Sequence, residues 1–332
     1  MAISPDVGIP DAGVPEPERG GVPGEPVPLR PSDVIKTYRY LRIGLVAAVV
    51  LLFTAILIEH GRTATDCWQR SISAYYYTPV RAIFVGALMA VGLSLIVYKG
   101  RSPGEDPFLN FAGMLAPVVA IVPTNDVGVC YSIPPEPLPK TADGSPAGWV
   151  IANIDNNYKA LLITGALGLL AAAFIALVVN RKDIMGAARD QLLTTVSLIG
   201  TGLVLVAAWW AIENWGSFYT KAHSWAAIAM FVMLIGAIVA VTLDSRDRGA
   251  FWFWTYAAIA AAMVIGALVI VLTRAFGEHT TFALETYEIA LFAVYWVTQT
   301  VEKWNEEVNP ATVTVTVGVA PSPGAAPSGL VP

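Results

Sequence analysis

Long apolar runs separated by short polar turns constrain the fold of this chain more than any other feature. Eight such runs follow one another, most of them near or above the roughly 18 residues that cross a bilayer as a helix. The sequence therefore predicts an all-α, polytopic transmembrane helix bundle with about eight spans. The expected spans are 41–59, 80–98, 108–124, 159–179, 191–212, 223–243, 251–273 and 282–301.

The composition agrees with membrane insertion. Of the 332 residues, 55% are hydrophobic and 14% are charged, whereas a soluble domain carries about 25% charged residues. The net charge of −5 is modest and no basic block occurs, so we expect no nucleic-acid partner. Membrane lipids are the partners that this composition predicts.

Both ends of the chain differ from the apolar body. Residues 1–33 are rich in Pro, Gly and Glu, and residues 306–332 have a similar low-complexity composition. Such segments cannot bury enough apolar surface to offset the entropy of ordering them. We expect two disordered tails around a transmembrane domain at 34–305.

The third run, 108–124, is the weakest candidate span. It is short and contains Pro117 and Pro123, which remove backbone donors but are tolerated where neighbouring helices satisfy the freed carbonyls. A kinked or partly re-entrant segment is the alternative to a full span.

Lysine and arginine near the ends of the runs predict the orientation. With a cytoplasmic N-terminus, 13 of the 20 basic residues fall on the inner side and seven on the outer side, as the positive-inside rule requires. The prediction is a multi-pass protein of the cytoplasmic membrane with both termini cytoplasmic.

The only two cysteines, Cys67 and Cys130, fall in the first and second outer loops of this topology. An oxidising compartment favours a disulfide between them. Two unrelated thiols remain the alternative.

Small residues recur in several of the runs and predict close helix–helix packing, since lipid tails give helices no hydrophobic drive to associate. They are Gly86, Ala90, Gly92, Gly165, Gly168, Gly200 and Gly202.

Polar residues gather on the predicted outer side. Glu285 and Glu288 lie three residues apart at the start of the last run, hence on one helix face, and a carboxylate within a bilayer usually faces a partner or a water-filled cavity. We expect an Arg81–Glu285 ion pair with Tyr76 and His223 nearby, and Gln299 would extend the polar stripe inward. The candidate vestibule comprises Ser71, Ser73, Tyr76, Arg81, Asp126, His223, Glu285 and Glu288.

Each of these residues also has a structural interpretation. Arg81 can extend to lipid headgroups, and Tyr75 to Tyr77 can form an interfacial aromatic belt. His223 can be a hydrogen-bonded helix-start residue, and the two glutamates can form a structural salt bridge.

Established catalytic motifs are absent from the sequence. It has no GxSxG, HExxH, P-loop or Gly-rich dinucleotide motif, and the histidines lack the spacing of metal ligands. We expect no metal and no cofactor.

The stretch SISAYYYTPVRAIFVGAL and the following NFAGMLAPVVAIVPT resemble a family of polytopic actinobacterial membrane proteins without an assigned activity, itself distantly similar to DRAM/Sfk-type multi-span proteins. HSWAAIAMF, from His223, and LETYEIALFAVYW, with Glu285, resemble two later motifs of that family. The resemblance implies the same multi-span fold over most of residues 65–305. Related sequences are expected to have a histidine where this chain has NIDNNYKALL. The matching positions are Ser71, Ser73, Tyr75, Tyr76, Tyr77, Thr78, Arg81, Phe84, Val85, Gly86, Asn110, Gly113, Pro123 and Thr124.

Three functional interpretations follow. The first is an outward-facing vestibule that binds a lipid headgroup or small polar solute, with Arg81 holding an anionic group. The second is a ceramidase-like, metal-dependent intramembrane hydrolase using Ser71 or Ser73, Asp126 and His223. The third is a structural membrane subunit that binds another subunit through its long outer loop, about 125–158.

Overall fold

The computed structural model of this chain describes residues 31–63, 67–100, 104–175 and 188–304, and of residues 31–35 and 188–198 only the helical backbone. The chain divides into the helical unit Lys36–Glu307 and a terminal unit, Met1–Ile35 with Val308–Pro332. The predicted disordered tails lie outside the described residues, except that the first helix begins at Pro31. Proline suits the first helical turn, where its missing N–H would have no partner.

The described part of the chain contains eight α-helices and three short 3-10 helices, and it contains no strand. The fold is therefore all-α, as predicted. The α-helices are α1 (Pro31–His60), α2 (Arg81–Val97), α3 (Glu105–Ile121), α4 (Gly148–Phe174), α5 (Ala188–Asn214), α6 (Phe218–Asp244), α7 (Ala250–Thr273) and α8 (Thr280–Glu302). The 3-10 helices are η1 (Ser73–Tyr77), η3 (Ser245–Arg248) and η4 (Gly277–His279).

Four of the described helices are long and apolar enough to cross a membrane, namely α1 from Lys36, α4, α6 and α7. Helix α2 and the part of α5 whose side chains are described, Ile199–Asn214, are apolar but shorter. The third predicted run is one continuous helix, α3, with Pro117 inside it. Large apolar side chains such as Leu93, Leu167 and Leu272 are more than half exposed, as expected for helices that face lipid.

Helix α3 is central to the bundle because it packs against both α2 and α6. A Cβ on Gly92 of α2 would lie 2.8 Å from the carbonyl oxygen of Gly113, and a Cβ on Gly113 would lie 2.6 Å from that of Gly92. The two backbones therefore approach too closely for any larger residue. Of the glycines expected to mediate packing, Gly92, Gly165 and Gly202 lie against a neighbouring helix. A Cβ on Gly86, Gly168 or Gly200 would meet nothing within 4 Å among the described residues.

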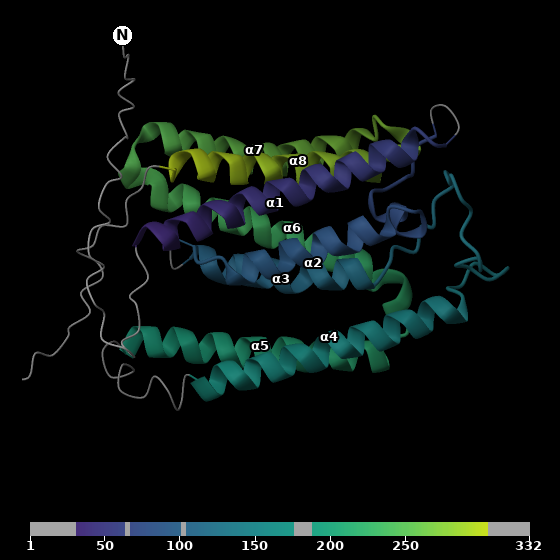
Figure 1. Ribbon diagram of the computed structural model, residues 1–332, viewed down its shortest axis with the longest axis horizontal. Coiled ribbons are helices and arrows are strands. Elements are labelled where there is room, and N and C mark those ends of the chain that lie inside the picture. Colours follow the sequence, from purple (N-terminus) through teal and green to yellow (C-terminus); the bar gives the residue numbers. More distant parts are fainter. Residues whose placement is uncertain (1–30, 64–66, 101–103, 176–187, 305–332) are drawn as a thin grey trace, which may run out of the picture. The chain divides into compact units, whose positions relative to one another are not determined.

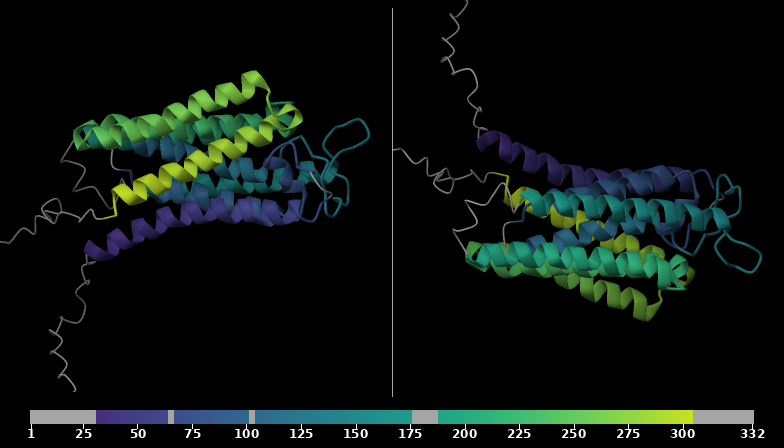
Figure 2. Two further views of the ribbon diagram at one scale, coloured as in Figure 1. Left: turned by 90° about the horizontal axis from the view of Figure 1, so that it is seen from above. Right: turned by 90° about the horizontal axis from the view of Figure 1, so that it is seen from below.

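The helices of the Lys36–Glu307 unit run side by side, and α1 begins at the same end of the bundle at which α8 ends (Figure 1). Helix α7 packs against α8, and Figure 2 shows the bundle from two further sides. We call the end of the bundle at which α1 begins and α8 ends the inner end, following the predicted topology. The opposite, outer end carries the loops between α1 and α2 and between α3 and α4.

Helix α4 begins at Gly148, eleven residues before the predicted run at 159. Its first turns bury Val150, Ile154, Tyr158 and Leu162 at a four-residue spacing against Phe218 and Ile212. These turns are amphipathic, so a search for uniformly apolar runs misses them. The outer loop before α4 is correspondingly shorter than predicted.

Candidate functional site

The stretch from Ser71 to Val80 fills the outer end of the bundle rather than lining a surface. Tyr75, Tyr76 and Tyr77 are 1%, 5% and 9% exposed, so the interfacial-belt interpretation is wrong for all three rings. They pack with Leu52 and Phe84 in one apolar cluster. Burial raises the pKa of Tyr75 to about 12 and that of Tyr77 further, so both phenols stay protonated at neutral pH.

Glu285 holds this stretch in place from the second turn of α8. Its Oε2 accepts hydrogen bonds from the backbone N–H groups of Ile72 (2.6 Å) and Ser73 (3.3 Å), and its Oε1 accepts one from the Ser73 hydroxyl (3.1 Å). The carboxylate thus satisfies donors at the start of η1, where negative charge is stabilising. Ser71 supplies a further cap, because its hydroxyl oxygen accepts the N–H of Ala74.

The expected Arg81–Glu285 ion pair is wrong. The guanidinium of Arg81 lies 4.3 Å from the centre of the Tyr76 ring and donates to the Tyr76 hydroxyl at 2.7 Å. This cation–π contact occurs because Arg81 and Tyr76 flank the sharp turn into α2. Glu285 instead meets backbone donors that the loop would otherwise leave unpaired.

His223 lies on α6 with a partner of its own. It is 4% exposed, and its Nδ1 lies 2.6 Å from the carbonyl oxygen of Val122, so Nδ1 carries the proton. Val122 directly follows α3, and His223 satisfies a carbonyl there that has no partner within the helix. His223 therefore bonds the end of α3 and makes no hydrogen bond with Arg81 or Glu285.

The residues proposed for a hydrolase each bond a different partner and not one another. Ser71 caps η1, Ser73 binds Glu285, and Asp126 accepts the N–H of Gly128 in a local turn. Within the described ranges, no three His, Cys, Asp or Glu side chains are grouped so that they could hold a metal ion.

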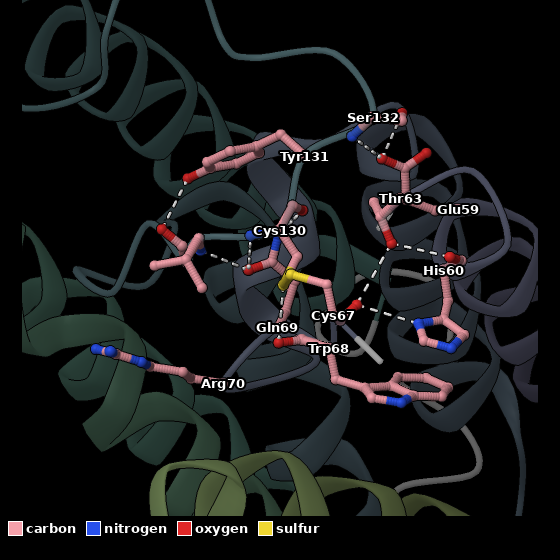
Figure 3. The surroundings of a disulfide bond; sticks show 12 residues. Glu59, His60, Thr63, Cys67, Trp68, Gln69, Arg70, Cys130, Tyr131 and Ser132 are labelled. Atoms are coloured by element: carbon pink, nitrogen blue, oxygen red, sulfur yellow. Dashed lines mark hydrogen bonds between the residues drawn. A yellow bond between two sulfur atoms is a disulfide. The ribbon is translucent and has the colours of Figure 1, made fainter. Parts of the chain in front are cut away.

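The predicted disulfide between Cys67 and Cys130 is confirmed, with an S–S distance of 2.00 Å. Gln69 reinforces it, because its side chain accepts the N–H of Val129 at 3.0 Å and donates to the carbonyl oxygen of Cys130 (Figure 3). Glu59, at the end of α1, accepts the N–H and hydroxyl of Ser132 at 3.1 and 2.6 Å. The two outer loops are thus tied to each other and to α1.

The start of α8 is also tied to the first outer loop. The N–H of Phe282 donates to the carbonyl oxygen of Arg70 at 2.8 Å, and Arg70 forms an exposed ion pair with Glu278 at 2.9 Å. With Glu285, these contacts fix the register of α8 against the loop. The remaining predicted glutamate, Glu288, lies one turn further into the bundle.

Glu288 is the predicted site residue whose carboxylate has no partner, and the Nε2 of His223 is also buried without one. The residue is 3% exposed, and neither Oε1 nor Oε2 accepts a hydrogen bond. On the same helix, Thr286 Oγ1 and Trp296 Nε1 are also buried without partners. A buried polar atom without a partner costs about 1–3 kcal/mol, so these positions need an explanation beyond packing.

A second polar cluster, which no motif in the sequence indicates, lies at the inner end. Glu105, which is 0% exposed, accepts hydrogen bonds from the Tyr295 hydroxyl (2.9 Å) and from Gln299 Nε2 (3.0 Å). Gln299 Oε1 in turn accepts the Tyr98 hydroxyl at 2.9 Å. Gln299 was expected to extend the polar stripe inward, and it does so by joining this cluster.

Searches of protein-family models, of curated proteins and of solved structures each found no match. The resemblance of the stretch from Ser71 to Arg81 to an actinobacterial membrane family therefore stays a prediction.

Proposed function

We propose that this chain is an eight-span protein of the cytoplasmic membrane, with both termini inside, that binds a small polar solute or lipid headgroup in the outer half of its bundle. Glu288 is the residue that meets the ligand. The resemblance to multi-span actinobacterial proteins forms part of the same proposal.

The observation that carries the proposal is the buried, unpartnered carboxylate of Glu288. Ionisable side chains within membrane helices are costly and mark ligand, ion or proton sites. Both carboxylate oxygens of Glu285, on the same face, already accept hydrogen bonds from the loop. Glu285 is therefore not available to bind a ligand. Glu288 is the group left to do so, about 12 Å along the helix from the start of α8.

The chemistry of Glu288 defines the ligand. An ionised carboxylate only accepts hydrogen bonds, so its complement is a donor such as a primary ammonium or a hydroxyl group. Arg81, which was expected to hold an anion, is instead engaged by Tyr76. The proposed ligand is therefore a cationic or hydroxyl-bearing headgroup rather than an anionic one.

Thermal unfolding of the detergent-solubilised protein with ethanolamine or short-chain phosphatidylethanolamine tests this proposal. We expect both compounds to raise the melting temperature of the wild type and neither to raise that of Glu288→Gln. Glu278→Gln is the matched control, since Glu278 is 76% exposed at the side chain, and it should respond like the wild type. Equal responses of wild type and Glu288→Gln would reject Glu288 as the binding group.

A second candidate function is binding of another membrane subunit through the outer loop. Val129, Ile133 and Leu138 are 61%, 66% and 69% exposed, in a loop whose base is fixed by the disulfide. We infer that these three exposed apolar side chains, all in one loop, contact the partner subunit. Native mass spectrometry tests this: a co-purifying subunit should be lost when all three residues are changed to serine.

A further inference from the structure

A small hollow lies at the outer end of the bundle. It has a volume of about 220 Å³, part of which is open to solvent. None of the described residues of α8 line it, so a site here does not depend on Glu288 or on the proposed function. Its lining includes Tyr77 of η1, Asn125 after α3, Lys140 in the loop before α4, Val150 of α4 and Tyr219 of α6.

The walls of the hollow are held by hydrogen bonds within the protein. The Tyr77 hydroxyl donates to the carbonyl oxygen of Thr124 at 2.9 Å, which fixes the residues after α3 against η1. In the loop before α4, the N–H of Ala147 donates to the carbonyl oxygen of Pro139 at 2.9 Å. The same turn forms a β-bridge at Lys140, so the backbone that carries this lysine is fixed beside the hollow.

Four polar side chains of the hollow have protons to donate and no acceptor among the described residues. Lys140 forms no ion pair or hydrogen bond there, and neither the Asn125 amide nor the Tyr219 hydroxyl forms a hydrogen bond. The Thr124 hydroxyl oxygen accepts the N–H of Asp126, which leaves its own proton unused. Ammonium, amide and hydroxyl groups all donate hydrogen bonds, so the hollow offers several donors to an anion.

No carboxylate opposes Lys140 in the hollow, since the described residues that line it include no Asp or Glu. Asp126, beside the lining, accepts a backbone N–H with its Oδ1. Asp155 and Glu213, near the first turn of α6, are both paired with Lys159, at 2.8 and 3.0 Å. The positive charge of Lys140 is thus not neutralised within the hollow.

We propose that this hollow is a binding site for a small carboxylate at the outer end of the bundle. The ammonium of Lys140 pairs with the carboxylate, and the Asn125 amide and Tyr219 hydroxyl donate to its oxygens. Pro123 and Val150, both buried in the lining, supply an apolar surface for a short alkyl group. The small volume suits a short-chain acid.

Saturation-transfer difference NMR of the full-length protein in detergent gives the first test, with sodium acetate as the probe. The acetate methyl signal should show transfer from the protein that saturates with acetate concentration. Equimolar sodium chloride should leave this transfer unchanged, because chloride has no second oxygen for the donors and no alkyl group for the apolar surface. Absence of saturable transfer, or displacement of acetate by equimolar chloride, would overturn the proposal.

Variants locate the site. In Lys140→Gln, the affinity for acetate should fall about tenfold, as for loss of a charge-assisted hydrogen bond, and in Tyr219→Phe it should fall less. Lys221→Gln is the matched control, because Lys221 is an exposed lysine in the first turn of α6 that does not line the hollow. If Lys140→Gln does not fold, Tyr219→Phe decides alone. Unchanged affinity in the folded variants, or an equal fall in Lys221→Gln, would overturn the assignment.

Discussion

The outer and inner ends of the bundle are held by different kinds of hydrogen bond. At the outer end, Glu59, Gln69 and Glu285 bind backbone N–H groups of loops. At the inner end, Glu105 and Gln299 bind other side chains that project from helix ends.

The difference follows from the lengths of the connections. The outer loops have little regular structure, so their buried backbone groups need side-chain partners. At the inner end, Glu105, Gln299, Tyr98 and Tyr295 bond one another through their side chains, so that network is not required by unpaired backbone groups. We therefore expect changes at the outer end to disorder loops and changes at the inner end to loosen helix packing.

The largest expected effect comes from the disulfide. Replacing Cys67 and Cys130 with serine should lower the free energy of unfolding by about 4 kcal/mol, because the bond closes a long loop in the unfolded chain. Denaturant unfolding in detergent, with and without reductant, measures the loss. Hydrogen exchange should speed up at the outer loops and not at the start of α3; equal acceleration at both would remove the distinction between the ends.

The next effect concerns Glu285. Glu285→Ala leaves the N–H groups of Ile72 and Ser73 and the Ser73 hydroxyl without their acceptor, and we expect a loss of about 2–3 kcal/mol. Glu285→Gln keeps one acceptor oxygen and should lose less. Thermal unfolding measures both. A loss for Glu285→Gln as large as that for Glu285→Ala would mean that charge, rather than loop pairing, explains the contact.

At the inner end, Gln299→Leu removes the residue that links Tyr98 to Glu105. We expect a loss of about 2 kcal/mol, since the carboxylate and the phenol each lose a partner in a buried site. A double-mutant cycle with Tyr98→Phe should show coupling of about 0.5–1 kcal/mol or more. Additive losses would mean that the two side chains do not act as one network.

Much of this fold could be predicted from the sequence because apolar runs report directly on helices. All eight expected runs correspond to helices in the described residues, although α4 begins earlier because its first turns are amphipathic. The disulfide was predictable because only two cysteines exist and the topology puts both in outer loops.

The pairing of polar groups could not be predicted in the same way. Glu285 was expected to face an arginine, but it binds backbone N–H groups, which have no signature in the sequence. Glu59 and Glu105 were missed because each lies at the end of an apolar helix, where a carboxylate usually reaches water. Only the three-dimensional arrangement shows that both are buried, at 2% and 0% exposure.

The smallest expected effect is a rise, not a fall, in the free energy of unfolding. It concerns Glu288, which takes part in the hydrogen bonds of neither the outer nor the inner end. Glu288→Leu removes a buried carboxylate without partners, so we expect the free energy of unfolding to rise by about 1 kcal/mol. Glu285→Leu, one turn away on the same face, should lower it, and thermal unfolding of the two variants in one detergent makes the comparison. Destabilisation by both leucines would show that Glu288 contributes to packing like its neighbour. A gain at Glu288 alone would identify it as a residue kept at a cost to stability, as expected of a side chain that binds a ligand.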